Sequence, residues 1–241
     1  MSALVVIPAR MAASRLPGKP LADIGGRPMI AWMAQIAAAA KVGPVVVAAA
    51  EPEIAKAAEA AGAHAVLTDP DLPSGTDRVK VAADLVDPDG THQVIVNLQG
   101  DMPTIDSGLL RTALAALSPD AHMATLVSPS DDPAHRADPN VVKAIVSWNG
   151  PVGRCLYFTR APAPSGDGPI QRHVGIYVYR RAALDRFVAA PPSPLEVREK
   201  LEQLRALEMG LRIDAACVAD FPKGVDSPKD LEAARIALAG R

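Results

Sequence analysis

Residues 3–21 read ALVVIPARMAASRLPGKPL, and this stretch decides how the chain begins to fold. The apolar run Ala3–Ile7 predicts a buried strand, which ends in a basic loop that contains Arg10, Arg15 and Lys19. Open α/β sheets bind their ligands at the carboxyl ends of such strands. The loop prolines stiffen the loop and so reduce the entropy lost when a ligand is gripped. We therefore expect a polyphosphate ligand here, although a solvated basic loop is the simpler alternative.

The remainder of the first half alternates short apolar runs with alanine-rich segments, which predicts βαβ units around a mostly parallel sheet. The expected strands are 3–8, 44–49, 64–67 and 93–98, and the expected helices are 28–40, 53–61, 75–86 and 106–117. Beyond residue 120 the alternation changes. Expected strands at 123–128, 141–147, 153–158 and 172–180 indicate an antiparallel extension, followed by a helix over 194–209, a strand over 211–216 and a helix from Pro228.

Composition excludes several classes of protein. The 25 basic and 27 acidic residues give a net charge of −2, so no cationic field favours nucleic acid. No apolar run is long enough to cross a bilayer, and the chain starts without a signal sequence, so we expect a cytoplasmic protein with no membrane partner. Cys155 and Cys217 have no metal-ligand spacing and are expected to be reduced core thiols.

Two aspartates are candidates for a metal site beside the basic loop. Asp101 follows the strand 93–98 in the segment Asn97–Pro103, and Asp226 precedes the helix N-cap Ser227. A carboxylate near a polyphosphate is repulsive unless a cation lies between them, and Mg²⁺ prefers one or two carboxylates together with phosphate oxygens. A turn aspartate and a charge at a helix N-terminus are the simpler alternatives.

Other polar candidates have both a functional and a structural interpretation. Ser74 and Arg78 lie at the start of the helix 75–86, where Ser74 is either a helix cap or a ligand contact. The candidates of the second half are Arg160, His173, Glu202 and Gln203. Residues 161–170 are rich in Pro, Gly and Ser, which is typical of a mobile loop or lid.

These segments, taken in order along the chain, resemble the 3-deoxy-manno-octulosonate (KDO) cytidylyltransferases. The resemblance rests on motifs from end to end: Pro8–Arg10, Arg15–Leu21, Ser74–Arg78, Asn97–Asp101, Tyr157–Arg160, Arg172–Tyr177, Pro192–Glu196, Leu201–Arg205 and Gly224–Pro228. It implies a single cytidylyltransferase domain over 1–241 with a Rossmann-like nucleotide-diphospho-sugar transferase fold. Residues 120–190 would be a β-rich extension that contributes to the sugar site and to a dimer interface.

The resemblance also implies an activity. CTP and KDO would give CMP-KDO and pyrophosphate for lipopolysaccharide synthesis, with Mg²⁺ as cofactor and a homodimer as the assembly. The implied catalytic residues are Lys19, Asp101 and Asp226, and the two aspartates would bind the metal. CTP would be bound by Arg10, Arg15, Lys19, Ser74, Arg78 and Gln99, and the sugar acid by Arg160, His173, Glu202 and Gln203.

Three departures from the family pattern leave alternatives open. Ala49-Ala50 stands where a Thr-Asp pair is usual, Met102 replaces an acidic residue, and the loop after Arg160 is short. The sugar acid could therefore be an amino-KDO or a nonulosonate. A catalytically silent nucleotide-binding protein is the alternative from another functional class.

Overall fold

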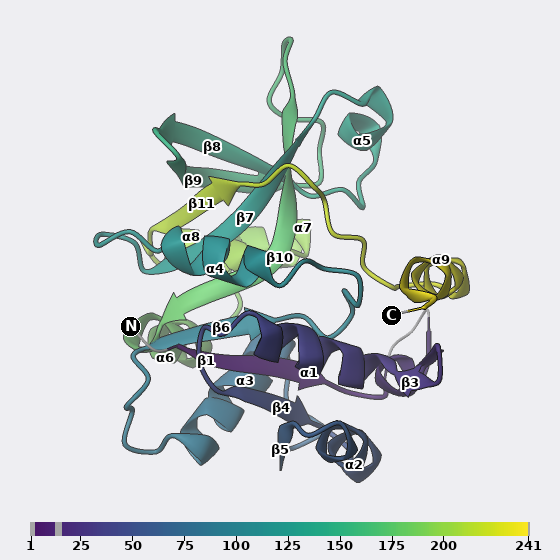
Figure 1. Ribbon diagram of the computed structural model, residues 1–241. Coiled ribbons are helices and arrows are strands. Elements are labelled where there is room, and N and C mark those ends of the chain that lie inside the picture. Colours follow the sequence, from purple (N-terminus) through teal and green to yellow (C-terminus); the bar gives the residue numbers. More distant parts are fainter. Residues whose placement is uncertain (1–2, 13–15, 241) are drawn as a thin grey trace. The chain divides into compact units, whose positions relative to one another are not determined.

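The structure is a computed structural model that describes residues 3–12 and 16–240. Its contacts divide the chain into two compact units (Figure 1). Unit 1 comprises Met1–Arg111 and Pro222–Arg241, and unit 2 comprises Thr112–Phe221. The single domain that we expect over 1–241, and the interface role of residues 120–190, stay predictions.

Unit 1 is built on four parallel strands in the order β5–β4–β1–β6. Their bounds are β1 Leu4–Ala9, β4 Val45–Ala49, β5 His64–Leu67 and β6 Val94–Leu98. Val6 of β1 pairs with Val46 on one side and with Asn97 on the other. All of β6 and all but the first residue of β4 are buried, as continuous apolar runs predict for strands covered on both faces. The predicted parallel sheet is confirmed.

The helices of unit 1 follow their strands as predicted. They are α1 Met29–Ala39, α2 Pro52–Ala60, α3 Gly75–Val86 and α9 Pro228–Leu238, and α4 Gly108–Ala115 spans the sequence boundary between the units. The predicted N-cap Ser227 is confirmed, and with Asp230 it forms a capping box that opens α9. We did not predict the 3₁₀ helix η1 Lys19–Leu21 or the hairpin of β2 Asp23–Ile24 and β3 Arg27–Pro28.

The last helix returns to the beginning of the chain. In Figure 1 α9 lies beside the β2–β3 hairpin, and the two share a small apolar cluster. Trp32 of α1 and Val225 and Leu231 from the C-terminal segment belong to that cluster, and the Trp32 indole donates a hydrogen bond to the carbonyl of Ile24 (2.9 Å). This packing anchors the segment that carries Asp226 to unit 1.

Unit 2 contains five strands in the order β10–β7–β11–β9–β8, and β8 also pairs with β10. The strands are β7 Met123–Ser130, β8 Lys143–Asn149, β9 Val152–Thr159, β10 Ile170–Arg180 and β11 Ile213–Cys217, and the helices are α5 Pro133–Ala137, α6 Arg181–Ala189, α7 Pro194–Glu199 and α8 Gln203–Glu208. Most of the pairings are antiparallel, as predicted, but β7 and β11 are parallel. Helices α5 and α6 were not predicted.

The single helix expected over 194–209 is wrong. Lys200 adopts a left-handed conformation (φ 55°) that ends α7, and α8 begins only at Gln203. The periodicity of apolar residues continues through the break, so the pattern alone predicts one helix. The break leaves Lys200 and Glu202 in a turn between two short helices.

The Arg136 side chain contacts two points of the loop over 161–170. Arg136 of α5 donates hydrogen bonds to the carbonyls of Pro164 and Gly168 (2.6 Å each). These bonds fix both sides of the loop to α5. A lid function of the loop stays a prediction.

The cysteines differ in their surroundings. Both are free thiols, and burial raises the pKa of Cys155 to about 12, so that it is inert. Cys217, at the end of β11, is exposed, and the expectation that it is a core thiol is wrong. Among residues 3–12 and 16–240, no helix has the length and apolar character required to cross a membrane.

Candidate active site

A cavity of about 350 Å³ lies at the carboxyl ends of β1 and β6 in unit 1. Every described residue that we predict to contact CTP or metal lines it, namely Arg10, Lys19, Ser74, Arg78, Gln99, Asp101 and Asp226. Arg15 lies outside the described residues. The structure therefore brings together side chains from four separate segments of the chain.

Lys19 lies between the two aspartates. Its Nζ donates to Oδ2 of Asp101 at 2.8 Å and to Oδ1 of Asp226 at 3.2 Å. Partial burial by itself lowers the pKa of the Lys19 ammonium, but the two carboxylates outweigh this effect and raise the pKa above its usual value. Lys19 is therefore a firmly held cation at physiological pH.

Backbone contacts bring the two aspartates to the same place. The N–H of Val225 donates to the carbonyl of Asp101 (2.8 Å), which sets Asp226 beside it. Gly100 lets the end of β6 approach β1, because a Cβ atom there would lie 3.1 Å from the carbonyl oxygen of Pro8. Gly18 adopts the left-handed conformation (φ 71°) that starts η1 and thereby places Lys19.

Arg78 is almost fully buried, at 2% exposed. Its guanidinium donates to Oγ1 of Thr68 (2.5 Å) and to the carbonyls of Asp69 (2.9 Å) and Pro70 (3.3 Å). These bonds hold the segment that leads to Ser74 at the cavity wall. Arg78 thus shapes the cavity, and its direct contact with CTP stays a prediction.

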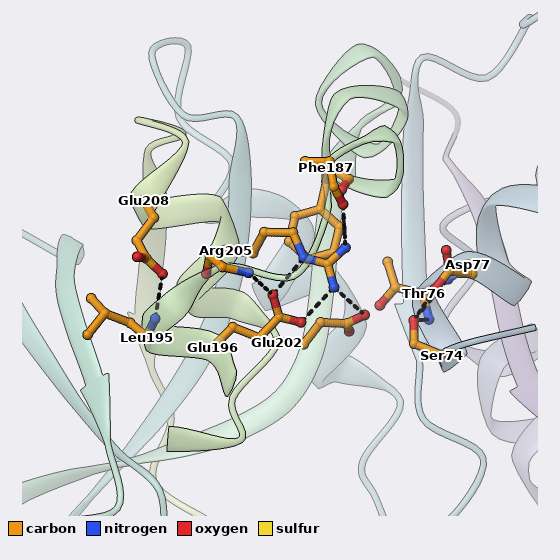
Figure 2. Close-up of polar contacts among 11 residues, drawn as sticks. Ser74, Thr76, Asp77, Phe187, Leu195, Glu196, Glu202, Arg205 and Glu208 are labelled. Atoms are coloured by element: carbon orange, nitrogen blue, oxygen red, sulfur yellow. Dashed lines mark hydrogen bonds and ion pairs between the residues drawn. The ribbon is translucent and has the colours of Figure 1, made fainter. Parts of the chain in front are cut away.

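Ser74 caps α3, as its structural interpretation predicts. Its Oγ accepts from the N–H groups of Thr76 and Asp77 and donates to Oδ2 of Asp77 at 2.6 Å (Figure 2). Nε2 of Gln99 donates to Oδ1 of Asn97 (3.1 Å). Ser74 and Gln99 both line the cavity, so each is held by a protein group and also faces the space for a ligand.

The four residues predicted to contact the sugar acid all belong to unit 2. Arg160 follows β9, His173 lies on β10, and Glu202 and Gln203 stand at the start of α8. The His173 ring packs between the rings of Phe158 and Tyr177, with centroids 5.2 and 5.3 Å away.

His173 is a neutral imidazole in this environment. Burial lowers its pKa to about 4, and its Nε2 lies 3.0 Å from Oγ1 of Thr125. The Thr125 hydroxyl faces the carbonyls of Val174 and Ile176 and donates there, which leaves its oxygen to accept from Nε2–H. In this tautomer Nδ1 can accept a hydrogen bond from a sugar hydroxyl, but His173 brings no charge to a carboxylate.

A buried ion pair holds the turn that carries Glu202 (Figure 2). Arg205 of α8 contacts both carboxylate oxygens of Glu196, at 2.8 and 2.6 Å, and its guanidinium lies over the Phe187 ring at 4.6 Å. Burial alone raises the pKa of Glu196, but hydrogen bonds from Arg205 and from the Ser193 N–H lower it overall. Glu202 lies 4.0 Å from Arg205, at the edge of this cluster.

Neither Arg205 nor Lys143 was singled out from the sequence as a candidate residue. Arg205 belongs to the motif around Glu202 but has no distinctive spacing of its own. Lys143 is a lone cation inside the apolar run Val141–Val146, and that anomaly was the available signal.

Comparison with known proteins identifies the family. Residues 4–213 match the cytidylyltransferase family model. The chain is 62% identical over 240 residues to the 3-deoxy-manno-octulosonate cytidylyltransferase of Parvibaculum lavamentivorans, covering 99% of this chain and 93% of that one. The chain belongs to the 3-deoxy-manno-octulosonate cytidylyltransferase family. It is also 57% identical over 241 residues to the cytidylyltransferase of the same name from Azorhizobium caulinodans, covering 98% and 95% of the two chains.

A solved structure supports the same assignment. The chain is similar to a CMP:2-keto-3-deoxy-manno-octonic acid synthetase complexed with CTP, with a TM-score of 0.92, 37% identity and 99% coverage of both chains. The predicted α/β fold of the KDO cytidylyltransferases is thereby confirmed.

Proposed function

We propose that the cavity around Lys19, Asp101 and Asp226 is where this chain transfers CMP from CTP to KDO. The products are CMP-KDO and pyrophosphate, as in its family. The observation that carries this location is the convergence of one ammonium and two carboxylates at the carboxyl ends of β1 and β6.

The phosphate-binding part of the site is assigned to the first loop. Arg10 and Lys19 both line the cavity, and the raised pKa of Lys19 favours its charged form. Together with Arg15 they would neutralise the triphosphate and the charge that develops on departing pyrophosphate. Ser74, Arg78 and Gln99 would face the nucleoside.

Asp101 and Asp226 fit a Mg²⁺ ion. One oxygen of each already meets the same cation, Lys19 Nζ, so the two carboxylates converge on one point. No third acidic, histidine or cysteine side chain joins them in the described part of the chain, and Mg²⁺ commonly completes such a pair with substrate phosphates. Mg²⁺ held there would neutralise phosphate charge as a Lewis acid.

The sugar acid would be bound by Arg160, His173, Glu202 and Gln203. Arg160 is the charged partner for its carboxylate, because His173 is neutral. Glu202 and Gln203 suit hydroxyl groups. In the reaction, the anomeric oxygen forms a bond to the α-phosphorus, the bond from that phosphorus to the leaving pyrophosphate breaks, and the hydroxyl proton is released. The chain needs no covalent nucleophile for this step.

We further propose that the enzyme works as a homodimer in the cytoplasm and supplies lipopolysaccharide synthesis. Support comes from the family membership. Light scattering tests the dimer. One chain has a mass of 25.1 kDa, and a homodimer should give twice this mass.

A substrate panel tests the proposed function. Pyrophosphate release is measured with CTP or UTP against KDO, an amino-KDO and a nonulosonate. We expect release with CTP and KDO, its loss in Asp101→Asn, and its retention in the exposed control Asp89→Asn. If the enzyme preferred another sugar acid, that acid would replace KDO as the proposed substrate. CTP binding without turnover on any of the three sugar acids would contradict the proposed activity.

A further inference from the structure

Lys143 is a fully buried lysine on β8, at 0% exposed. Its Nζ donates to two backbone carbonyls, that of Asp138 at 2.7 Å and that of Arg160 at 3.0 Å. Burying an ammonium is costly, and here burial lowers its pKa. A buried lysine that contacts carbonyls is uncommon, so its position calls for a specific role.

The Arg160 side chain is held by hydrogen bonds in the same part of unit 2. Its guanidinium donates from Nε to the carbonyl of Glu199 (2.9 Å), from Nη1 to that of Pro139 (2.9 Å) and from Nη2 to that of Lys200 (3.3 Å). Its own N–H donates to Oε2 of Glu199 (3.0 Å). These side-chain bonds use three of the five guanidinium donors, so one N–H of each terminal nitrogen stays available to a carboxylate.

The two cations hold the same two segments. Lys143 ties the carbonyl of Asp138 to that of Arg160, and the Arg160 side chain reaches back to the adjacent carbonyl of Pro139. Removal of the ammonium would take this donor from the carbonyl of Arg160, whereas the carbonyl of Asp138 would keep the N–H of Val141 (3.2 Å). The backbone on which Arg160 stands would thereby be freed.

The nearby carboxylates are engaged by other groups. Oδ1 of Asp138 accepts from the N–H and amide of Asn140, and Glu199 accepts from the Thr159 hydroxyl as well as from Arg160. The Lys143 ammonium therefore adds a positive charge behind Arg160 without a direct hydrogen bond to either acid, and this charge also favours an incoming anion.

We propose that Lys143 is a positioning residue for recognition of the sugar acid. It fixes the Arg160 backbone and the carbonyls that orient the guanidinium, so that Arg160 presents its two remaining N–H groups to the carboxylate of the sugar. Lys143 itself does not touch the substrate. This inference rests on the proposed role of Arg160.

The test is a double-mutant cycle on the sugar KM. Lys143→Met, Lys143→Gln and Arg160→Met are compared with the exposed control Lys56→Met. We expect Lys143→Gln to raise the KM for the sugar acid about tenfold while the KM for CTP changes less than about twofold. The double variant Lys143→Gln/Arg160→Met should be no worse than Arg160→Met, because Lys143 acts through Arg160. Lys143→Gln keeps a donor and serves if Lys143→Met fails to fold.

Three results would overturn the proposal: an unchanged sugar KM, equal increases in both KM values, or multiplicative effects in the double variant. Hydrogen exchange without substrate separates this proposal from the proposed function. If the wild type used no sugar acid, the function would fail. Faster amide exchange at 138–140 and 159–161 in Lys143→Gln would then still support the positioning role of Lys143, and unchanged exchange would refute it.

Discussion

The Nζ atom of Lys19 lies 2.8 Å from Oδ2 of Asp101, although 82 residues separate them in the sequence. A second carboxylate, that of Asp226, lies 3.2 Å from the same nitrogen. The lysine ammonium offsets part of the negative charge of two acids that would otherwise repel each other more strongly at the cavity wall.

Replacing Lys19 by Met should lower kcat by about 10²- to 10³-fold, the usual effect of removing one electrostatic contact to the transition state. Pyrophosphate release measures this. The control Lys56→Met also removes a lysine charge, but from an exposed position on α2, and should keep wild-type activity. A Lys19→Met enzyme with a kcat within twofold of the wild type would remove Lys19 from the mechanism.

Replacing Asp226 by Asn should raise the Mg²⁺ concentration needed for half-maximal activity by at least about tenfold, because one of two carboxylate ligands is lost. The measurement is a Mg²⁺ titration of pyrophosphate release at fixed CTP. The control Asp89→Asn should leave the midpoint in place. A midpoint that Asp226→Asn does not move would argue against a metal ligand at this position.

Breaking the Arg205–Glu196 pair should destabilise the protein strongly. Glu196→Gln takes from the Arg205 guanidinium, whose side chain is 8% exposed, the carboxylate that contacts it at 2.6 Å and leaves Glu202 at 4.0 Å. The expected loss in the free energy of unfolding is about 3–5 kcal/mol. Urea denaturation measures it. Arg235→Lys, in the exposed pair with Glu232, should change stability by less than about 0.5 kcal/mol. Similar losses in both variants would contradict the distinction.

His173 should make stability depend on pH between about 6.5 and 4. Burial lowers the folded-state pKa to about 4, so over this window the unfolded histidine binds a proton that the folded one does not. Stability therefore falls as pH falls through the window. Melting temperatures from pH 7 to 4 should decline less steeply in His173→Gln than in the wild type, and parallel curves would show that His173 is not responsible.

Lys41 ends α1 in a left-handed conformation (φ 54°), which favours glycine. Lys41→Gly should therefore stabilise the protein by about 0.5–1 kcal/mol, since it removes the steric cost of a side chain there. The same substitution inside α2, Lys56→Gly, should destabilise by about 1 kcal/mol. Chemical denaturation of both variants compares the two, and a loss of stability in Lys41→Gly would count against strain at this residue.

Much of the fold follows from local pattern. The strand over 64–67 and the helix over 75–86 occur at their predicted bounds, because apolar spacing and the Ser74 cap act over a few residues. The prediction of one helix over 194–209 was wrong because the left-handed conformation of Lys200 leaves no trace in the periodicity of apolar residues. The parallel pairing of β11 with β7 was not predicted for a related reason, since strand partners depend on long-range packing.

The sequence by itself determined the βαβ order, the basic first loop and the set of polar residues at strand ends, since these depend on neighbouring residues and on matching motifs. Only the tertiary structure decided that Lys19 meets both Asp101 and Asp226, the latter 207 residues away. It also decided that His173 is neutral and that Lys143 is buried beneath Arg160. Distances between remote residues and the loss of water around a charge exist only once the chain has packed.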